Sequence, residues 1–177
     1  MTIEKSISQQ IKDYAANLGF DACGFCRAEN IGEEEYMGLK KWIDQSFHGE
    51  MAYMANNMDK RTDPTLLVEG ARTIISLALN YYPRQMQSAD VPQFAYYAYG
   101  KDYHDVMKRK LQQLFDYIKS LVPDMEGRFF CDTAPVLERY WAMKAGVGFI
   151  GKNSLLIIPK KGSLILFSNL LKSGKTV

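Results

Sequence analysis

Asp132 is the side chain whose position in this sequence most suggests chemistry. It follows an apolar stretch typical of a strand and precedes Thr133-Ala134-Pro135, which is typical of a helix start. Spacing alone favours an ordinary helix N-cap at such a place. The functional alternative is a proton donor, although free aspartic acid, with a pKa of about 3.9, donates poorly at neutral pH. A bound cofactor that covered Asp132 would raise this pKa by excluding water.

Two further side chains could act as a base, a ligand or an anion-binding group. His104 lies in Gly100-Lys101-Asp102-Tyr103-His104-Asp105, although a polar residue in the first turn of a helix is more often a solvated neighbour. Arg61 could bind an anionic group through its planar guanidinium, although most isolated arginines only face water. Residue type alone does not decide between these alternatives.

The cysteines include one pair with the spacing of redox and metal sites. Cys23 and Cys26 form a C-x-x-C pattern, but residues three apart on a strand face opposite ways. Cys131 stands alone, and no second pair follows. We therefore expect structural burial of these thiols and no metal site.

A glycine-rich segment partly matches two nucleotide-binding patterns. Gly146, Gly148 and Gly151 fit G-x-G-x-x-G, and Lys152 extends the match toward a phosphate-binding loop, in which Asn153 replaces the required serine or threonine. An expected helix precedes these glycines and a strand follows, which reverses the order that places N–H groups around a phosphate. We therefore predict a glycine-rich helix exit, where the backbone can approach a large flat cofactor closely.

The elements that must position these residues alternate along the chain. Apolar residues at three- and four-residue steps predict helices, the first capped by Thr2 and stopped by Gly19, over residues 3–18, 36–47, 102–122 and 132–146. Short β-branched or aromatic runs predict strands over 22–26, 73–82, 94–99, 128–131, 155–158 and 164–167. The last two strands are expected to form a hairpin, with loops at 48–62 and 84–91. This order predicts an α+β fold, a mixed sheet flanked by helices.

Size and composition limit the class of protein. With 177 residues and 47% hydrophobic content, the chain is expected to form one domain over residues 1–177. The 22 basic and 20 acidic residues nearly balance, so net charge neither demands nor excludes a polyanionic partner. The first residues carry charges where a signal peptide needs an apolar core, and the apolar runs are shorter than the roughly 20 residues of a membrane span. We expect a cytoplasmic monomer without membrane contact.

Three linked motifs resemble the epoxyqueuosine reductase family in order and spacing. They are Tyr99-Gly100-Lys101-Asp102-Tyr103-His104, Asp132-Thr133-Ala134-Pro135-Val136-Leu137-Glu138-Arg139, and Lys144-Ala145-Gly146-Val147-Gly148-Phe149-Ile150-Gly151-Lys152-Asn153. Gly19-Phe20-Asp21 and Lys60-Arg61-Thr62-Asp63-Pro64 also resemble the family, so the likeness covers essentially the whole chain. The resemblance implies a nitroreductase-like cobalamin-binding domain. It also implies an oxidoreductase that converts epoxyqueuosine to queuosine at the wobble position of transfer RNA.

The resemblance also implies roles for particular residues. It makes Asp132 the general acid that protonates oxygen while reduced cobalt attacks the epoxide carbon. The implied cofactor is cobalamin, as cob(II)alamin, and no side chain is implied as a cobalt ligand. Besides Asp132, the residues expected to line this cofactor are Arg61, Ala95, Tyr97, Lys152, Asn153, Leu156 and Phe167.

The electron supply that the resemblance implies has no counterpart in this sequence. It consists of two [4Fe-4S] clusters in a following ferredoxin-like portion, whereas three cysteines cannot form a four-cysteine cluster and the sequence ends at Val177. The expected partners are therefore transfer RNA carrying epoxyqueuosine and an external electron donor or the missing ferredoxin-like portion. The alternative is a non-catalytic corrinoid- or flavin-binding module, and the sequence leaves both possibilities open.

Overall fold

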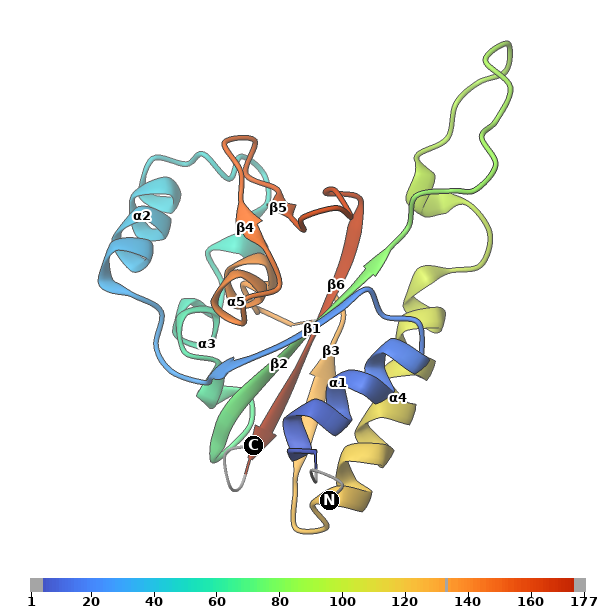
Figure 1. Ribbon diagram of the computed structural model, residues 1–177. Coiled ribbons are helices and arrows are strands. Elements are labelled where there is room, and N and C mark those ends of the chain that lie inside the picture. Colours follow the sequence, from blue (N-terminus) through green and yellow to red (C-terminus); the bar gives the residue numbers. More distant parts are fainter. Residues whose placement is uncertain (1–4, 133, 174–177) are drawn as a thin grey trace.

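A four-stranded sheet with helices on both of its faces forms the centre of the molecule (Figure 1). The computed structural model describes residues 5–132 and 134–173, without the side chains of Phe167 and residues 169–173. The strand order is β1-β2-β6-β3, and each described pair is antiparallel. These strands are Ala22–Arg27 (β1), Ala71–Asn80 (β2), Ile165–Ser173 (β6) and Gly127–Phe130 (β3). The predicted α+β class is confirmed.

One face of the sheet packs against two amphipathic helices, α1 (Ile7–Asn17) and α4 (Tyr103–Leu121). Because side chains alternate across a strand, Ile75 and Leu77 of β2 meet these helices. The intervening Ile74 faces the other side of the sheet. Because both faces of β2 are covered, most of its residues are apolar, as expected for a central strand.

The opposite face carries the shorter elements. α5 (Glu138–Lys144) packs there together with a separate two-stranded sheet of β4 (Phe149–Ile150) and β5 (Leu156–Ile157). α2 (Glu33–Asp44) and α3 (Met58–Thr62) lie on this side in Figure 1. The segment 48–62, predicted as a loop, thus contains α3 and the 3-10 turn η1 (Ala52–Met54), and a second turn, η2 (Pro64–Leu66), follows.

Two strand predictions are wrong because strand pairing depends on distant partners. The expected hairpin between 155–158 and 164–167 does not form, since β5 pairs with β4 while β6 pairs with β2 and β3. An isolated bridge between Ile158 and Gly162 closes the turn instead. The aromatic run 94–99 forms the short 3-10 helix η3 (Tyr96–Ala98) and not a strand. β propensity reflects packing in a sheet more than an intrinsic backbone preference.

Helix limits also differ from the predicted ones. Ser6 caps α1 through its side chain, while the predicted cap, Thr2, lies outside the described residues. The helix predicted over 132–146 begins only at Glu138. Gly146 follows α5 with a φ of +72°, which confirms the predicted glycine exit.

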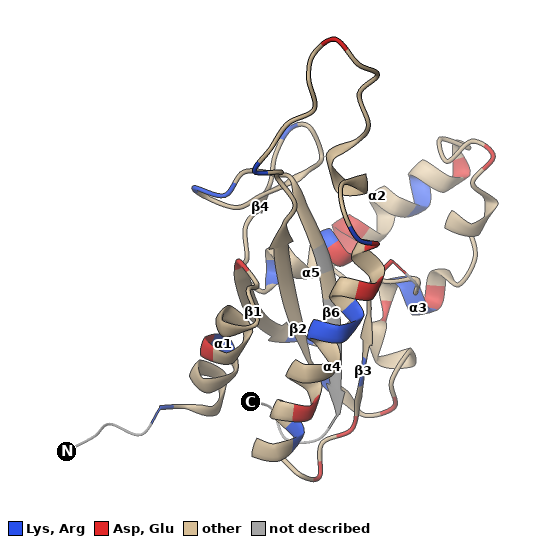
Figure 2. Ribbon diagram, turned by 90° about the vertical axis from the view of Figure 1, so that its right-hand side faces the viewer, with Lys and Arg blue, Asp and Glu red and all other residues tan. Residues whose placement is uncertain are grey.

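A long segment between β2 and α4 extends away from the body of the molecule (Figure 1). It covers residues 81–102 and contains η3. Several of its apolar side chains are exposed: Tyr82, Met86, Val91, Phe94 and Tyr97. In Figure 2 the ribbon colours place charged residues mainly on helices and loops and few on the central strands. Within residues 5–132 and 134–173, no helix combines the length and the apolar character needed to cross a membrane.

Candidate active site

Asp132 lies just beyond the end of β3 in a conformation that is uncommon for a residue with a side chain. Its φ is +56°, in the left-handed region that aspartate and asparagine tolerate better than most residues. α5 begins later, at Glu138, and its N-cap is Leu137. The interpretation of Asp132 as an ordinary helix N-cap is therefore wrong. Its side chain is 49% exposed and can reach a bound molecule.

Tyr103 donates a hydrogen bond to the Asp132 carboxyl group, with 2.7 Å between Tyr103 Oη and Asp132 Oδ2. Tyr103 opens α4 because the Asp102 side chain caps this helix by accepting from the His104 N–H. Burial, and then the bond to Asp132, raise the pKa of the Tyr103 hydroxyl. The phenol therefore stays protonated and remains a donor. Tyr103 was not predicted as a site residue, although it lies in the motif Tyr99-Gly100-Lys101-Asp102-Tyr103-His104.

His104 joins this group through its ring. The ring stacks on that of Tyr103, with centroids 4.0 Å apart and an interplanar angle of 29°. His104 Nδ1 lies 3.0 Å from Asp102 Oδ1, and Nε2 lies 3.9 Å from Asp132 Oδ2, beyond hydrogen-bonding distance. The contact with Asp102 holds the ring with Nε2 toward Asp132. His104 therefore borders the candidate site and is more than a solvated neighbour.

Glu138, the first residue of α5, contacts Asp132 from the other side. The Asp132 backbone N–H donates to Glu138 Oε1 over 3.3 Å. Burial, followed by the negative charge of Asp132, raises the pKa of Glu138 to about 8. Glu138 is therefore largely protonated at neutral pH. Its role was missed from the sequence because its only signal was its place in the motif that begins at Asp132.

Tyr97, one of the predicted cofactor-binding residues, lies beside the same group. Its ring contacts that of Tyr103 edge to face, with 6.2 Å between centroids and an angle of 86°. Ala95 immediately precedes η3 and is exposed. The structure thus brings Tyr97 and Asp132 together around Tyr103.

The turn between β4 and β5, together with the first residue of β5, carries three more predicted cofactor-binding residues. Lys152 and Asn153 are exposed, and Asn153 Oδ1 accepts from a backbone N–H within the turn. The side chain of Leu156 is only 1% exposed and packs into a core cluster. Leu156 can therefore offer only its backbone to a cofactor. The Arg139 guanidinium donates to a carbonyl of this turn and connects it to the start of α5.

The glycines before this turn are explained by packing of the chain against itself. A Cβ atom on Gly148 would lie 2.4 Å from the carbonyl oxygen of Ile157, and one on Gly151 would lie 2.7 Å from Ile157 Cδ1. At these positions the close approach is to β5, and not to a cofactor as predicted. The segment follows α5 and contains the short strand β4, and no helix follows it before β5, so the reversed order that argues against nucleotide binding is confirmed.

Arg61 lies in α3 and is almost completely buried, with 8% exposure. Its terminal nitrogen donates to the Tyr53 carbonyl over 3.2 Å, whereas Nε has no hydrogen-bond partner among the described residues. Burial lowers the pKa of this guanidinium. A buried donor without a partner is costly, so Arg61 fits the predicted role of holding a cofactor rich in amide and phosphate oxygens. No described contact joins Arg61 to Asp132. Phe167 lies in β6, and its side chain is outside those described.

The cysteines have the environment of structural thiols. Cys23 packs with the cluster on the α1 and α4 side, while Cys26 packs with the cluster on the α5 side, which confirms that they face opposite ways. Burial raises the pKa of Cys23, Cys26 and Cys131 to about 12. Thiolates are therefore scarce at neutral pH. In the part of the chain that the structure describes, no group of three or more His, Cys, Asp or Glu side chains could hold a metal ion.

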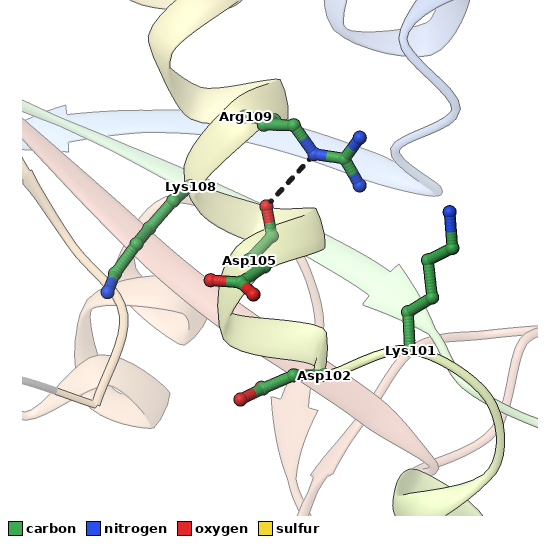
Figure 3. Close-up of a pocket in the computed structure, with 5 residues that line it drawn as sticks. All are labelled: Lys101, Asp102, Asp105, Lys108 and Arg109. Carbon is green, nitrogen blue, oxygen red and sulfur yellow. Dashed lines mark hydrogen bonds between the residues drawn. The ribbon is translucent and has the colours of Figure 1, made fainter.

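A depression of about 510 Å³ borders the candidate site at the start of α4 (Figure 3). Its lining residues are Lys101, Asp102, Asp105, Lys108 and Arg109. In Figure 3, Lys101 and Arg109 extend on one side of the helix and Lys108 on the other, and Arg109 Nε donates to the Asp105 carbonyl over 3.3 Å. Three cations against two carboxylates give this surface a positive balance.

In this α+β fold, Asp132 is contacted by a phenol and by the carboxyl group of Glu138, an arrangement that is suited to proton transfer. A family profile described as epoxyqueuosine reductase QueG, DUF1730, matches residues 61–133, which include Arg61, Tyr103 and Asp132. The epoxyqueuosine reductase of Leadbetterella byssophila is 48% identical over 94% of this chain and 55% of its own length. Sequence similarity thus confirms the epoxyqueuosine reductase family that the motifs predicted. The chain spans about half the length of the curated relatives it matches.

Two solved structures show the same relationship in three dimensions. An epoxyqueuosine reductase crystallised with an epoxyqueuosine-modified stem loop of tRNA-Tyr is 27% identical, with a TM-score of 0.81 over 97% of this chain and 48% of that chain. The enzyme from Bacillus subtilis, with its catalytic aspartate loop swung out of the active site, is also 27% identical. Its TM-score is 0.80 over 95% of this chain and 46% of that chain.

Proposed function

We propose that this chain is the cobalamin-binding part of an epoxyqueuosine reductase and that Asp132 is its general acid. The observation that carries the proposal is the placement of Asp132, which is half exposed, left-handed in conformation and held by Tyr103 and Glu138. Two relatives support it, one with a catalytic loop named for an aspartate and one with a bound stem loop that carries epoxyqueuosine. The substrate proposed for this chain is likewise epoxyqueuosine in transfer RNA, and the product is queuosine.

The reaction needs electrons and protons from separate sources, because the epoxide oxygen leaves as water. Cobalamin, when bound, supplies the reducing equivalents. Asp132 protonates the oxygen as the carbon–oxygen bond opens, so that the oxygen does not have to depart as a free alkoxide. The Tyr103 hydroxyl stays hydrogen-bonded to Asp132 and stabilises the carboxylate that is left behind.

Two observations support a cofactor site formed by the predicted residues. The buried Nε of Arg61 lacks a partner among the described residues and can donate to an oxygen of the cofactor. The exposed ring of Tyr97, beside Tyr103, offers a flat apolar surface close to Asp132. The other proposed contacts are Ala95, Lys152, Asn153, the backbone of Leu156, and Phe167. An external donor or a ferredoxin-like portion with iron–sulfur clusters is proposed to reduce the cofactor.

The basic depression at the start of α4 supports a polyanionic substrate. Lys108 and Arg109 lie within the first turns of the helix that also presents Tyr103 and His104, and Lys101 lies just before its N-cap. Contacts to phosphates would fix the orientation of a stem loop while its modified base reaches Asp132. The proposed substrate is therefore RNA and not the free nucleoside.

Titration of the purified chain with cob(II)alamin, followed by absorbance and electron paramagnetic resonance, tests the cofactor assignment. We expect binding with the lower base detached and no histidine nitrogen on cobalt, because the chain has only two histidines, His48 and His104, and neither lies in a motif that carries a cobalt ligand in the family. His104→Gln and His48→Gln should leave the cobalt spectrum unchanged, whereas Arg61→Met should weaken binding about tenfold. Coordination of cobalt by a histidine, or no binding, would contradict the proposal. Binding without any substrate reduction would favour the non-catalytic module.

A further inference from the structure

An exposed aspartic acid does not by itself keep a proton at neutral pH. Free aspartic acid, with a pKa of about 3.9, is only about one part in a thousand protonated at neutral pH. The Asp132 side chain is 49% exposed, so burial in the protein is not sufficient to exclude water from it. The proposed acid catalysis therefore needs a second group that retains the proton in the site.

Glu138 lies next to Asp132, where a group that retains a proton for Asp132 has to be. Its Oε1 accepts from the Asp132 N–H over 3.3 Å, and the residues that follow it in α5, Tyr140 and Trp141, are buried in the core. On the other side, Tyr103 holds Asp132 Oδ2 at 2.7 Å. The Glu138 carboxyl group is therefore held beside the Asp132 backbone from α5, while Tyr103 of α4 holds the Asp132 carboxyl group.

We propose that Asp132 and Glu138 form a carboxyl pair that holds one proton between them at neutral pH. In this pair Glu138 is a positioning residue, which keeps the proton beside Asp132. The inference rests on the proposed function, since it explains how Asp132 has a proton to give. Two adjacent carboxylates repel each other in a partly buried site, and retaining one proton removes this repulsion.

The proton balance of the pair is simple. When the epoxide oxygen takes the proton, one O–H bond of the pair breaks and both carboxyl groups become ionised. A proton from solvent, which reaches the exposed Asp132 side, then restores the pair, and the restored pair can supply the second proton with which the oxygen leaves as water. No bond forms between the pair and the substrate, so the pair itself is neither oxidised nor reduced.

The surrounding titratable groups leave Asp132 as the main charged neighbour of Glu138. Burial and then Asp132 dominate the rise in the pKa of Glu138. Arg139 follows in α5, but its guanidinium donates to a carbonyl of the β4–β5 turn. Tyr103 and His104 of α4 contact or approach Asp132, and Cys131 precedes it. Asp102 and Lys108 act on these neighbours and not directly on Glu138.

Carbon-13 NMR of the side-chain carboxyl groups in the purified chain tests the pair without substrate or cobalamin. We expect the Glu138 signal, identified by its loss in Glu138→Gln, to titrate with a midpoint near pH 8. Asp132→Asn should move this midpoint to lower pH, because the neighbouring charge is gone. Glu69→Gln, at an exposed site, should leave it in place. An ordinary midpoint near 4.5 for Glu138, or one that Asp132→Asn does not move, would overturn the proposal.

The pH profile of the reconstituted reaction separates this role from simple support of the fold. Glu138→Gln keeps an acceptor for the Asp132 N–H but cannot store the proton. We expect its rate to match wild type in acid and to fall at lower pH than the wild-type rate does. A rate that is reduced equally at every pH would show a structural role only. If neither protein reduces the epoxide, the NMR titration still decides whether the pair exists.

Discussion

The two segments that flank α5 both contain motif matches, but their surroundings in the fold differ. The Asp132 segment, before the helix, exposes its carboxyl group and has contacts to α4 and α5. The glycine segment after the helix packs its backbone against β5. Both matched known motifs. The contacts, and not the motifs, identify which segment is suited to chemistry.

The difference between them follows from what occupies the space around each backbone. At Gly148 a neighbouring carbonyl fills the volume that a side chain would need. At Asp132 the backbone is left-handed although the residue is not glycine, which costs conformational energy. Such strain at an exposed polar residue is more informative about function than a glycine pattern, because packing alone does not explain it.

Asp132→Asn tests the chemical half of this comparison and should have the largest effect. Asparagine tolerates the left-handed conformation and can still accept from Tyr103, so the free energy of unfolding should change by no more than about 1 kcal/mol. Epoxide reduction with chemically reduced cobalamin should fall roughly a hundredfold or more, because proton donation is lost. Single-turnover rates and thermal unfolding measure the two effects. Unchanged turnover would leave Asp132 a structural residue.

Gly148→Ala tests the packing half. The added Cβ would meet the Ile157 carbonyl at 2.4 Å, so we expect a loss of about 1–3 kcal/mol in unfolding free energy. Gly38→Ala in α2 is the matched control, since nothing lies within 4 Å of its added Cβ and alanine favours a helix. Urea denaturation of both variants compares them. A tolerated Gly148→Ala would mean that β5 is not packed there as described.

The stability of the fold should depend on pH through Glu138. Its pKa in the folded protein, about 8, is raised above the ordinary value of 4.5. The neutral side chain therefore stabilises the folded state fully below pH 4.5, and this contribution is lost as pH rises through about 8. Glu138→Gln should flatten the dependence of melting temperature on pH in this window. An equally steep dependence in the variant would assign the effect to other groups.

Lys152→Ala should have the smallest effect, on a property that we expect to be absent. The glycine segment lies between a helix and a strand in the wrong order for phosphate binding, so neither ATP nor GTP should bind. Calorimetric titration of wild type and variant should give no signal for either nucleotide. Micromolar affinity of the wild type for ATP or GTP, lost in Lys152→Ala, would show that the glycine segment binds phosphate.

The sequence predicted those elements that local spacing determines. The stripes of α1 and α4, the run of β2 and the exit at Gly146 depend on near neighbours in the chain. Pairing of β6 with β2 and β3 depends on residues far away in the chain, which local spacing does not reveal.

The candidate site, like the fold, was predictable only where the signal lies in neighbouring residues of the chain. Asp132 emerged from its motif, whereas Tyr103 and Glu138 act through contacts that only the fold creates. Leu156 is the opposite case: the resemblance assigned it to the cofactor, but its side chain is packed in the core.

The most direct test of the central claim is the reaction itself. The purified chain would be loaded with cobalamin, treated with a chemical reductant, and given an RNA stem loop that carries epoxyqueuosine. Mass spectrometry of the nucleosides should show loss of one oxygen atom to give queuosine, and almost none with Asp132→Asn. An intact epoxide, although cobalamin is bound and reduced and the RNA is bound, would contradict the assignment of this chain as a cobalamin-dependent reductase domain.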